Sequence, residues 1–235
     1  MSAIGIMPSA PVLVPELAGA AAAEVADLAA AVREAAAQLP ARWIAVGTGP
    51  VDCVLDSNAV GTFAGFGVDV PVRLSPPRGT PPEGSEVSEI SELPLCALMA
   101  GWVRGQTQPE ASVQVRVWRG DRDVEAALSL GRRLRAEIDL VPDPIGVLII
   151  ADGANTLTPA APGGYHPDDA DAQLALDDAL ATGDVAALAR LPEQILGRVA
   201  FQVLAGLTEP GPRSVKELHR AAPYGVGYFA GVWQP

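Results

Sequence analysis

An unbroken apolar run, IGVLIIA at residues 145–151, constrains the fold more than any other part of this sequence. Successive side chains of a strand point to opposite faces of its sheet, so a strand without polar residues has to be buried on both faces. Two shorter runs, AIGIM at 3–7 and WIAVG at 43–47, predict further strands of the same kind. The sequence therefore predicts a central sheet with helices covering both faces.

Amphipathic segments between these strands predict the covering helices. The longest spans about 16–39, where apolar residues share one face and Pro40 ends the helix. Further helices are predicted at 93–105, at 123–138 and, in two or three pieces, up to residue 207. Buried strands that alternate with helices are typical of α/β folds. We therefore expect a three-layer α/β sandwich with a central, mostly parallel, mixed sheet.

Other segments complete this expectation. VPVRL at 70–74 and the alternating ASVQVRVW at 111–118 are predicted strands. The apolar and aromatic segment YGVGYFAGVW at 224–233 is expected to pair into the main sheet as a late strand. The Gly-rich stretch 47–67 and the Pro-, Gly-, Ser- and Glu-rich stretch 75–90 are interpreted as loops.

The composition indicates one folded domain over residues 1–235, because no linker or repeat divides the chain and 49% of it is hydrophobic. A net charge of −12 without a basic cluster argues against nucleic acid and anionic membranes as partners. The N-terminus lacks the pattern of a signal peptide, and charges in the Ala-rich segment argue against a membrane span. A cytoplasmic protein is expected, in which Cys53 and Cys96 are free thiols and not a disulfide.

Polar residues follow three of the predicted strands. Ligands of open α/β sheets bind beyond the carboxyl ends of the strands. Those ends are Met7-Pro8-Ser9, Gly47-Thr48-Gly49 and Ala151-Asp152-Gly153, and a long polar loop follows the last. The residues expected to line one ligand-binding cleft are Ser9, Thr48, Asp152, Asn155, Tyr165 and His166. For Asn155, a structural role as a turn residue is an equally good interpretation.

No catalytic residue follows directly from the sequence, and the candidates are Asp152, His166 and Ser9. A histidine can act as acid or base, whereas Ser9 would need a base supplied by the fold. The chain contains no GxSxG, P-loop or GxGxxG motif. His166 and the carboxylates after it match no established metal-ligand spacing, so no metal ligand is predicted.

Three segments together resemble a known superfamily. They are "MPSAPVLVPELAG" at 7–19, "VLIIADGANTLTPAAPGGYHPDDADAQLALDDALATGDVAALARL" at 147–191 and "APYGVGYFAGVW" at 222–233. The chain resembles the subunit-B-type class III extradiol dioxygenases, a superfamily that includes the Memo-like proteins, and more narrowly its small actinobacterial branch. The resemblance implies the fold of that superfamily and a relation to oxidoreductases that use ferrous iron.

The resemblance also implies where iron ligands would stand, and this chain departs from the pattern there. The first family histidine lies in a Pro-His-Pro-Pro-like turn, which here contains Ser9. The second follows a strand that here ends in Gly47-Thr48-Gly49, and the loop histidine would fall nearest to Asn155. Hydroxyl groups are poor ligands for ferrous iron beside imidazole and carboxylate.

The expectation is therefore a metal-free protein without a cofactor, non-catalytic or repurposed, that binds a small molecule or a partner in the strand-end cleft. The alternative is an enzyme with a rebuilt site that uses Asp152, His166 and Ser9. It would be an extradiol ring-cleaving oxidoreductase with Fe²⁺, or a hydrolase. Whether the chain is an enzyme stays open between these two, and a homo-oligomer is compatible with both.

Overall fold

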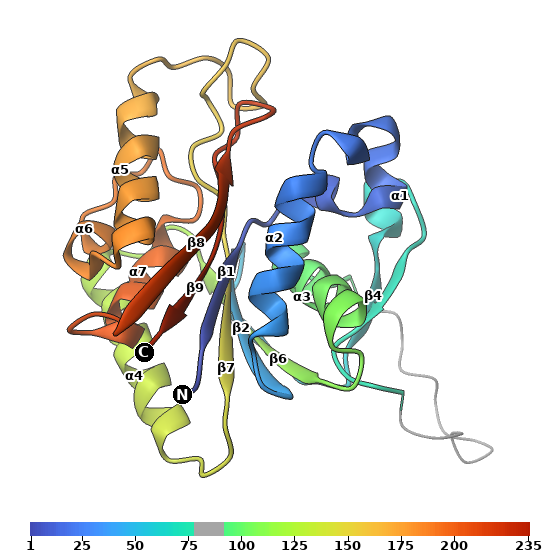
Figure 1. Cartoon of the computed structure of the whole chain (residues 1–235), viewed down its shortest axis with the longest axis vertical. Helices are drawn as coiled ribbons and strands as arrows, with labels where there is room; N and C mark the ends of the chain where they lie inside the picture. Colours follow the sequence, from blue (N-terminus) through green and yellow to red (C-terminus); the bar gives the residue numbers. More distant parts are fainter. Residues whose placement is uncertain (78–91) are drawn as a thin grey trace.

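Four parallel strands form the centre of a seven-stranded sheet, whose strand order is β3-β6-β2-β7-β1-β9-β8 (Figure 1). The computed structural model describes residues 1–77 and 92–235. The strands of this sheet are β1 (Ile4–Met7), β2 (Arg42–Gly49), β3 (Cys53–Leu55), β6 (Ser112–Arg119), β7 (Gly146–Ile150), β8 (Ser214–Ala221) and β9 (Tyr228–Gln234). Strands β6, β2, β7 and β1 pair in parallel, so their carboxyl ends share one edge of the sheet.

Antiparallel strands complete the sheet on both sides. Strand β9 pairs with β1, β8 pairs with β9, and β3 pairs with β6. The prediction that the C-terminal segment joins the main sheet is confirmed, although β9 begins at Tyr228 and not at 224. The sheet is therefore mixed, with a parallel centre.

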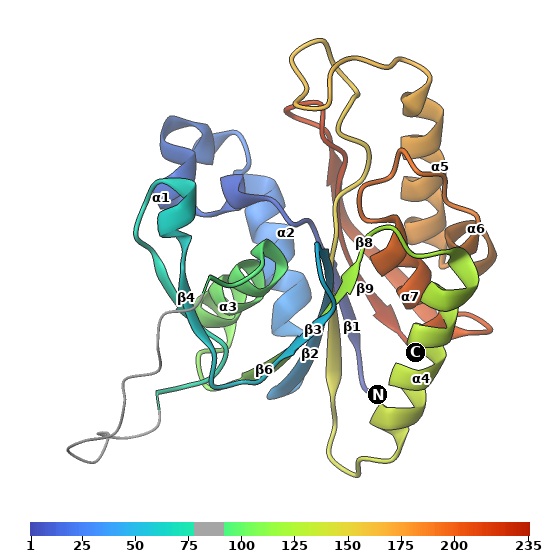
Figure 2. The ribbon, with the colours of Figure 1, turned by 180° about the vertical axis from the view of Figure 1, so that it is seen from behind.

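Helices cover both faces of the sheet and confirm the three-layer α/β sandwich (Figures 1 and 2). The helices of one layer are α2 (Ala26–Ala37) and α3 (Leu95–Thr107). The helices of the other layer are α4 (Val124–Asp139), α5 (Asp169–Thr182), α6 (Val185–Ala189) and α7 (Arg198–Thr208).

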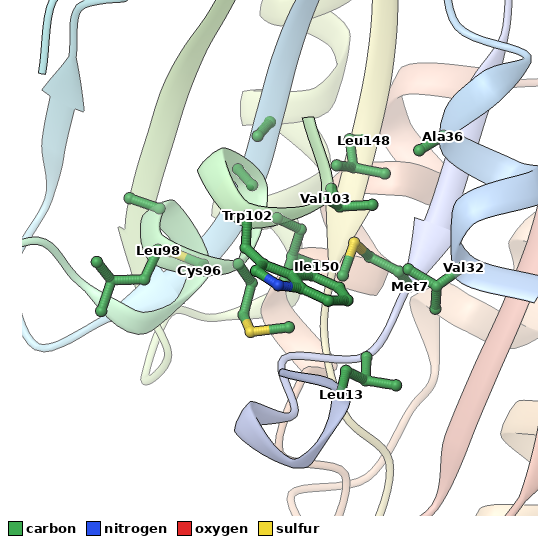
Figure 3. Close-up of a cluster of buried hydrophobic side chains, with 14 of the residues drawn as sticks. Met7, Leu13, Val32, Ala36, Cys96, Leu98, Trp102, Val103, Leu148 and Ile150 are labelled. Carbon is green, nitrogen blue, oxygen red and sulfur yellow. The ribbon is translucent and has the colours of Figure 1, made fainter. Parts of the chain in front are cut away.

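Strand β7 is buried along its whole length, as its apolar sequence predicts. Leu148 and Ile150 belong to the core under α2 and α3, whereas Val147 and Ile149 belong to the core under α4 and α7. Figure 3 shows Trp102 of α3 in the first of these cores. Burial of such a side chain contributes roughly 1.5–3 kcal/mol, so the two cores stabilise the sheet from both sides.

The predicted continuous helix at 16–39 is wrong. The segment forms α1 (Pro15–Ala18), a 3-10 turn (Gly19–Ala23) and α2. Gly19 adopts a φ of 54°, which ends the first helix. The turn has no buried residue. Helical propensity alone does not hold such an Ala-rich stretch in a continuous helix, because most helix stability in proteins comes from packing.

The prediction of loops and strands between 47 and 77 also needs correction. The Gly-rich stretch contains β3, β4 (Val60–Thr62) and a 3-10 turn (Phe63–Phe66). The predicted strand at 70–74 becomes β5 (Pro71–Arg73), which pairs only with β4 in a separate two-stranded sheet. Pro71 has no N–H to donate, which suits an edge position better than the centre of a sheet. The predicted loop at 75–90 lies outside the described residues from 78 onward.

Strand β8 was not predicted, because its sequence has the polar character of an edge strand. Lys216, Glu217 and Arg220 lie on it, and a bulge separates Glu217 from His219. Charged residues and bulges protect exposed edges from pairing with other chains. A strand of this kind lacks the apolar alternation that indicates strands in a sequence.

Two further expectations concern the cysteines and the membrane. Cys53 and Cys96 are free thiols, as predicted, and burial raises the pKa of Cys96 to about 12. Within residues 1–77 and 92–235, every helix is too short or too polar to cross a bilayer.

Candidate ligand-binding site at the strand ends

The parallel pairing of β1 with β7 brings two distant segments together. Met7 lies opposite Ile150 at the ends of the two strands, so Ser9 and Asp152 emerge side by side. The backbone N–H of Ser9 donates a hydrogen bond of 2.8 Å to Oδ1 of Asp152. Asn155 follows three residues later, within about 11 Å of Asp152 along the chain. Ser9 and Asp152 therefore lie side by side at this end of the sheet, and the ligand-binding cleft that they were expected to line stays a prediction.

Asp152 is a perturbed carboxyl group at this end of the sheet. Burial raises its pKa to about 6, although the hydrogen bond from Ser9 acts in the opposite direction. No described Lys, Arg or His forms an ion pair with Asp152, and Oδ2 accepts no hydrogen bond from a described residue. A buried carboxylate without a cation is unfavourable, and such groups concentrate at functional sites.

Tyr228, the first residue of β9, lies near this carboxylate. Burial and the charge of Asp152 raise the pKa of the Tyr228 hydroxyl, and Tyr224 adds to the effect. The side chain is only 6% exposed, yet its hydroxyl donates no hydrogen bond to any residue that the structure describes. Asp152 and Tyr228 thus provide an acceptor and a hydroxyl that a ligand can engage.

The loop after β7 is held against the turn between β8 and β9. Gly153 N donates to Gly227 O, and Gly227 N donates to Ala154 O, each at 2.8 Å. The buried side chain of Gln173 on α5 accepts from Ala154 N at 2.8 Å. Its amide nitrogen donates to Oδ1 of Asp177 at 2.9 Å. Gln173 therefore fixes the backbone that carries Asp152.

Both glycines beside Gln173 are required by close packing. A Cβ on Gly153 would lie 2.0 Å from Oε1 of Gln173, and a Cβ on Gly227 would lie 2.1 Å from the same amide. Real Cβ atoms do not approach so closely, so any side chain there would displace the amide and the loop.

Gln173→Ala is expected to lower the free energy of unfolding by about 2 kcal/mol or more. The substitution leaves the Ala154 N–H buried without an acceptor, and such a group costs about 1–3 kcal/mol before the lost packing is counted. Urea unfolding followed by circular dichroism measures the change. Gln194→Ala, at an exposed glutamine, is the matched control and should change stability by less than about 0.5 kcal/mol. Equal effects of the two substitutions would contradict this role for Gln173.

Among the described residues, the other predicted side chains form no hydrogen bond with the Asp152 carboxylate. A Cβ on Gly47 would point toward Cys96 of α3. The side chain of the next residue, Thr48, lies close to Gly120, which precedes α4. Because adjacent side chains alternate between faces, Thr48 belongs to the opposite face from Gly47. Tyr165 is 52% exposed, and His166 is exposed on the same loop.

Asn155 and its neighbours stabilise the loop itself. A Cβ on Gly163 would lie 2.4 Å from Oδ1 of Asn155, so the Asn155 side chain packs within its own loop. The hydroxyl of Thr156 donates to Oδ2 of Asp169 at 2.6 Å, which ties the loop to the start of α5. These contacts favour the interpretation of Asn155 as a turn residue.

An apolar hollow of about 360 Å³ opens at the same end of the sheet. Its lining includes Pro11, Val12, Leu17, Phe66 and Tyr224. The Tyr224 hydroxyl donates to Oε2 of Glu24 at 3.1 Å and so connects the β8–β9 turn to the segment before α2, 200 residues away.

Two tyrosines and one glutamate near Asp152 and the hollow were not predicted from the sequence as site residues. Tyr224, Tyr228 and Glu24 were treated only as strand or helix residues. The alternation of glycine and tyrosine in YGVGY at 224–228 is the signal that could have indicated them, because glycine allows close backbone approach.

Ferrous iron, which the resemblance implies, does not fit these residues. Ser9 engages Asp152 through its backbone, and no imidazole accompanies the carboxylate. His219 lies on the edge strand β8, and His166 is exposed on the loop after β7. Over 1–77 and 92–235, no group of three or more His, Cys, Asp or Glu residues is arranged to hold a metal ion.

Comparison with known proteins defines the fold and not the activity. No family model matches the sequence, and no curated protein matches it. Among solved structures, the chain is similar to the crystal structure of uncharacterized protein JW3007 from Escherichia coli K12. The similarity covers 99% of each chain with a TM-score of 0.59 and 9% sequence identity. At this identity the likeness shows a shared α/β sandwich over the full length of both chains.

Proposed function

We propose that this protein is a metal-free, non-catalytic or repurposed relative of the class III extradiol dioxygenase superfamily that binds a small molecule at the strand ends. The observation that carries the proposal is the pairing of the Ser9 N–H with Asp152 where the family pattern would have a metal ligand. The second oxygen of Asp152 and the hydroxyl of Tyr228 have no partner among the described residues. Unpaired polar groups beside an apolar hollow favour ligand binding.

The chemistry of the residues supports a role without ring cleavage. Activation of dioxygen depends on a redox-active metal, because the cofactor carries that reaction. The described side chains around Asp152 provide one carboxylate and hydroxyl groups, which do not bind ferrous iron well. A similar fold does not preserve an activity once its site has changed.

One observation favours the alternative of a rebuilt enzyme site. The pKa of Asp152, raised by burial to about 6, suits a general base at neutral pH. Oδ2 of Asp152 would have to accept the proton of the Ser9 hydroxyl, because Oδ1 already accepts a hydrogen bond from the Ser9 backbone. The same experiments therefore need to monitor turnover as well as binding.

The purified protein is expected to contain no stoichiometric iron or zinc. Ferrous iron added under anaerobic conditions should not enable cleavage of catechols after oxygen is admitted, because the ligand set does not fit the metal. Elemental analysis and an absorbance assay for ring-cleaved products provide the measurements. Close to one iron or zinc per chain, lost together with activity in His166→Ala, would establish the enzyme instead.

Binding itself is tested with a library of small polar and apolar fragments. Chemical-shift changes in the NMR spectrum should concentrate on the amides around Ser9, Asp152 and Tyr228. Fragments that bind only at distant surfaces, or no binding by any fragment, would contradict the proposed function.

A further inference from the structure

We infer that the strand-end site takes a small organic cation, a protonated amine joined to a compact apolar body. The apolar body occupies the hollow beside Tyr224, and the ammonium group faces Asp152 and Tyr228. The inference rests on the proposed function, because it names the class of ligand for the same site.

The hollow provides the apolar part of this site. Its volume of about 360 Å³ is at the lower end of the range for ligand pockets, so it suits a single ring with a short side chain. Phe66 lies in the lining although it is 47% exposed, which leaves a large aromatic surface open. Aromatic rings pack well against other rings, and their faces attract cations.

The hollow adjoins the turn that contacts the Asp152 carboxylate. Pro11 and Val12 line the hollow and directly follow the turn in which Ser9 donates to Asp152. On the other side, the charges of Asp152 and Tyr224 both act on Tyr228, and Tyr224 lines the hollow. A ligand that fills the hollow can therefore extend a short polar group toward Asp152 and Tyr228.

The charges around the site determine which polar group on the ligand is favoured. The residues named at this site lie in the stretches 1–32, 49–72, 151–189 and 221–235, which contain no lysine or arginine. Asp152 and Glu24 form no ion pair with any described residue, whereas Asp52, Asp139 and Glu209 each pair with a cation. A cationic ligand supplies the missing counter-charge, whereas an anionic ligand would be repelled.

Tyr228 provides a second, independent indication of a ligand. Its side chain is only 6% exposed, and its hydroxyl donates to no described residue. The hydroxyl is not one of the buried polar atoms without a partner, so it stays accessible to a ligand. A tyrosine has an apolar ring and a polar tip, so its ring can be buried while its hydroxyl stays available for a hydrogen bond. An amine beside Asp152 would place a polar group where the hydroxyl oxygen can accept a hydrogen bond.

Three probes that share a ring but differ in charge separate the contribution of the cation to binding from that of the apolar body. Benzylamine, benzyl alcohol and phenylacetate are titrated at pH 7.5 by NMR and calorimetry. We expect benzylamine to bind on the order of tenfold more tightly than the alcohol, the difference that one additional favourable ion pair produces, and phenylacetate to bind most weakly.

Two Asp→Asn substitutions, which change the charge of the protein by the same amount, test whether the site itself binds the cation. Asp152→Asn should reduce benzylamine affinity to that of the alcohol and leave the alcohol unchanged. Asp171→Asn, at an exposed position on α5, removes the same one negative charge and should leave all three affinities unchanged. Circular dichroism verifies that both variants are folded.

The outcomes distinguish this inference from the proposed function. If the alcohol or phenylacetate binds at the site as tightly as benzylamine, the cation inference is wrong and small-molecule binding stands. If Asp171→Asn reduces affinity as much as Asp152→Asn, general charge and not the site explains the preference, which also overturns the inference. If none of the three probes binds, the inference is wrong, and the fragment library decides the proposed function separately.

Discussion

Gly206→Ala is expected to destabilise the protein by about 3 kcal/mol or more, because α4 and α7 pack with their backbones in contact. A Cβ on Gly206 of α7 would lie 2.2 Å from the backbone oxygen of Leu128 on α4. The reverse contact is as close, since a Cβ on Gly131 of α4 would lie 2.2 Å from the oxygen of Val203. Backbone atoms cannot rotate away, so the methyl group has to separate the two helices.

The separation would also open the core below these helices. Leu134, Val203 and Leu207 are fully or almost fully buried there. Gly105→Ala is the matched control, because nothing lies within 4 Å of a Cβ at this exposed helical glycine of α3. This control should raise stability by about 0.5–1 kcal/mol through helix propensity. Urea unfolding measures both variants, and a Gly206→Ala protein as stable as the native one would refute the packing.

Asp152→Asn is expected to stabilise the protein at pH 8 by about 1–3 kcal/mol while it weakens ligand binding. Burial raises the pKa of Asp152 from its ordinary 3.8 to about 6, so ionisation is less favourable in the folded state than in the unfolded state. Each unit of that shift corresponds to about 1.4 kcal/mol. Asparagine has nearly the same shape, keeps an oxygen for the Ser9 N–H and cannot ionise.

The sign of the pH dependence follows from the raised pKa. Well below the ordinary pKa of 3.8 the carboxyl is protonated in both states, so the penalty is absent. The penalty grows as pH rises between 4 and about 6 and is complete above about pH 7. The stability difference between Asp152→Asn and the native protein should therefore be small at pH 4 and largest at pH 8. Asp171→Asn is the control, and a native protein more stable than Asp152→Asn at pH 8 would contradict the prediction.

A stabilising substitution that removes binding would identify Asp152 as a functional residue. Proteins commonly retain destabilising groups where binding or catalysis needs them. The combined result therefore separates a ligand-binding carboxylate from a structural one, since the loss of a structural hydrogen-bonding group lowers stability.

Much of the fold could be predicted from local patterns. The apolar run of β7 and the amphipathic sequence of α4 both correspond closely to the observed elements. These patterns report burial and helical period directly, because each depends on residues that are near in sequence. The same reasoning failed at 16–39, where alanines favour a helix but have little surface to bury, and at β8, where an edge strand carries charges.

The site was predictable only in part. The rule that ligands bind at the carboxyl ends of parallel strands led to Ser9 and Asp152, and the hydrogen bond between them shows that they are neighbours. The rule contains no information on the face of the sheet that each side chain occupies, and the Thr48 side chain lies toward Gly120. Tyr224 and Tyr228 were missed because their closeness to Asp152 depends on the antiparallel pairing of β9 with β1.

By itself, the sequence determined the buried strands, most of the helices and the absence of histidines from the strand-end positions, because these follow from residue type and local spacing. The tertiary structure alone decided that Ser9 contacts Asp152 across 143 residues and that Tyr224 reaches Glu24 across 200. Strand order and the alternation of side chains across a pleated sheet select such contacts. Neither property is encoded in a short stretch of chain, so the partners of a buried carboxylate become known only when the sheet is assembled.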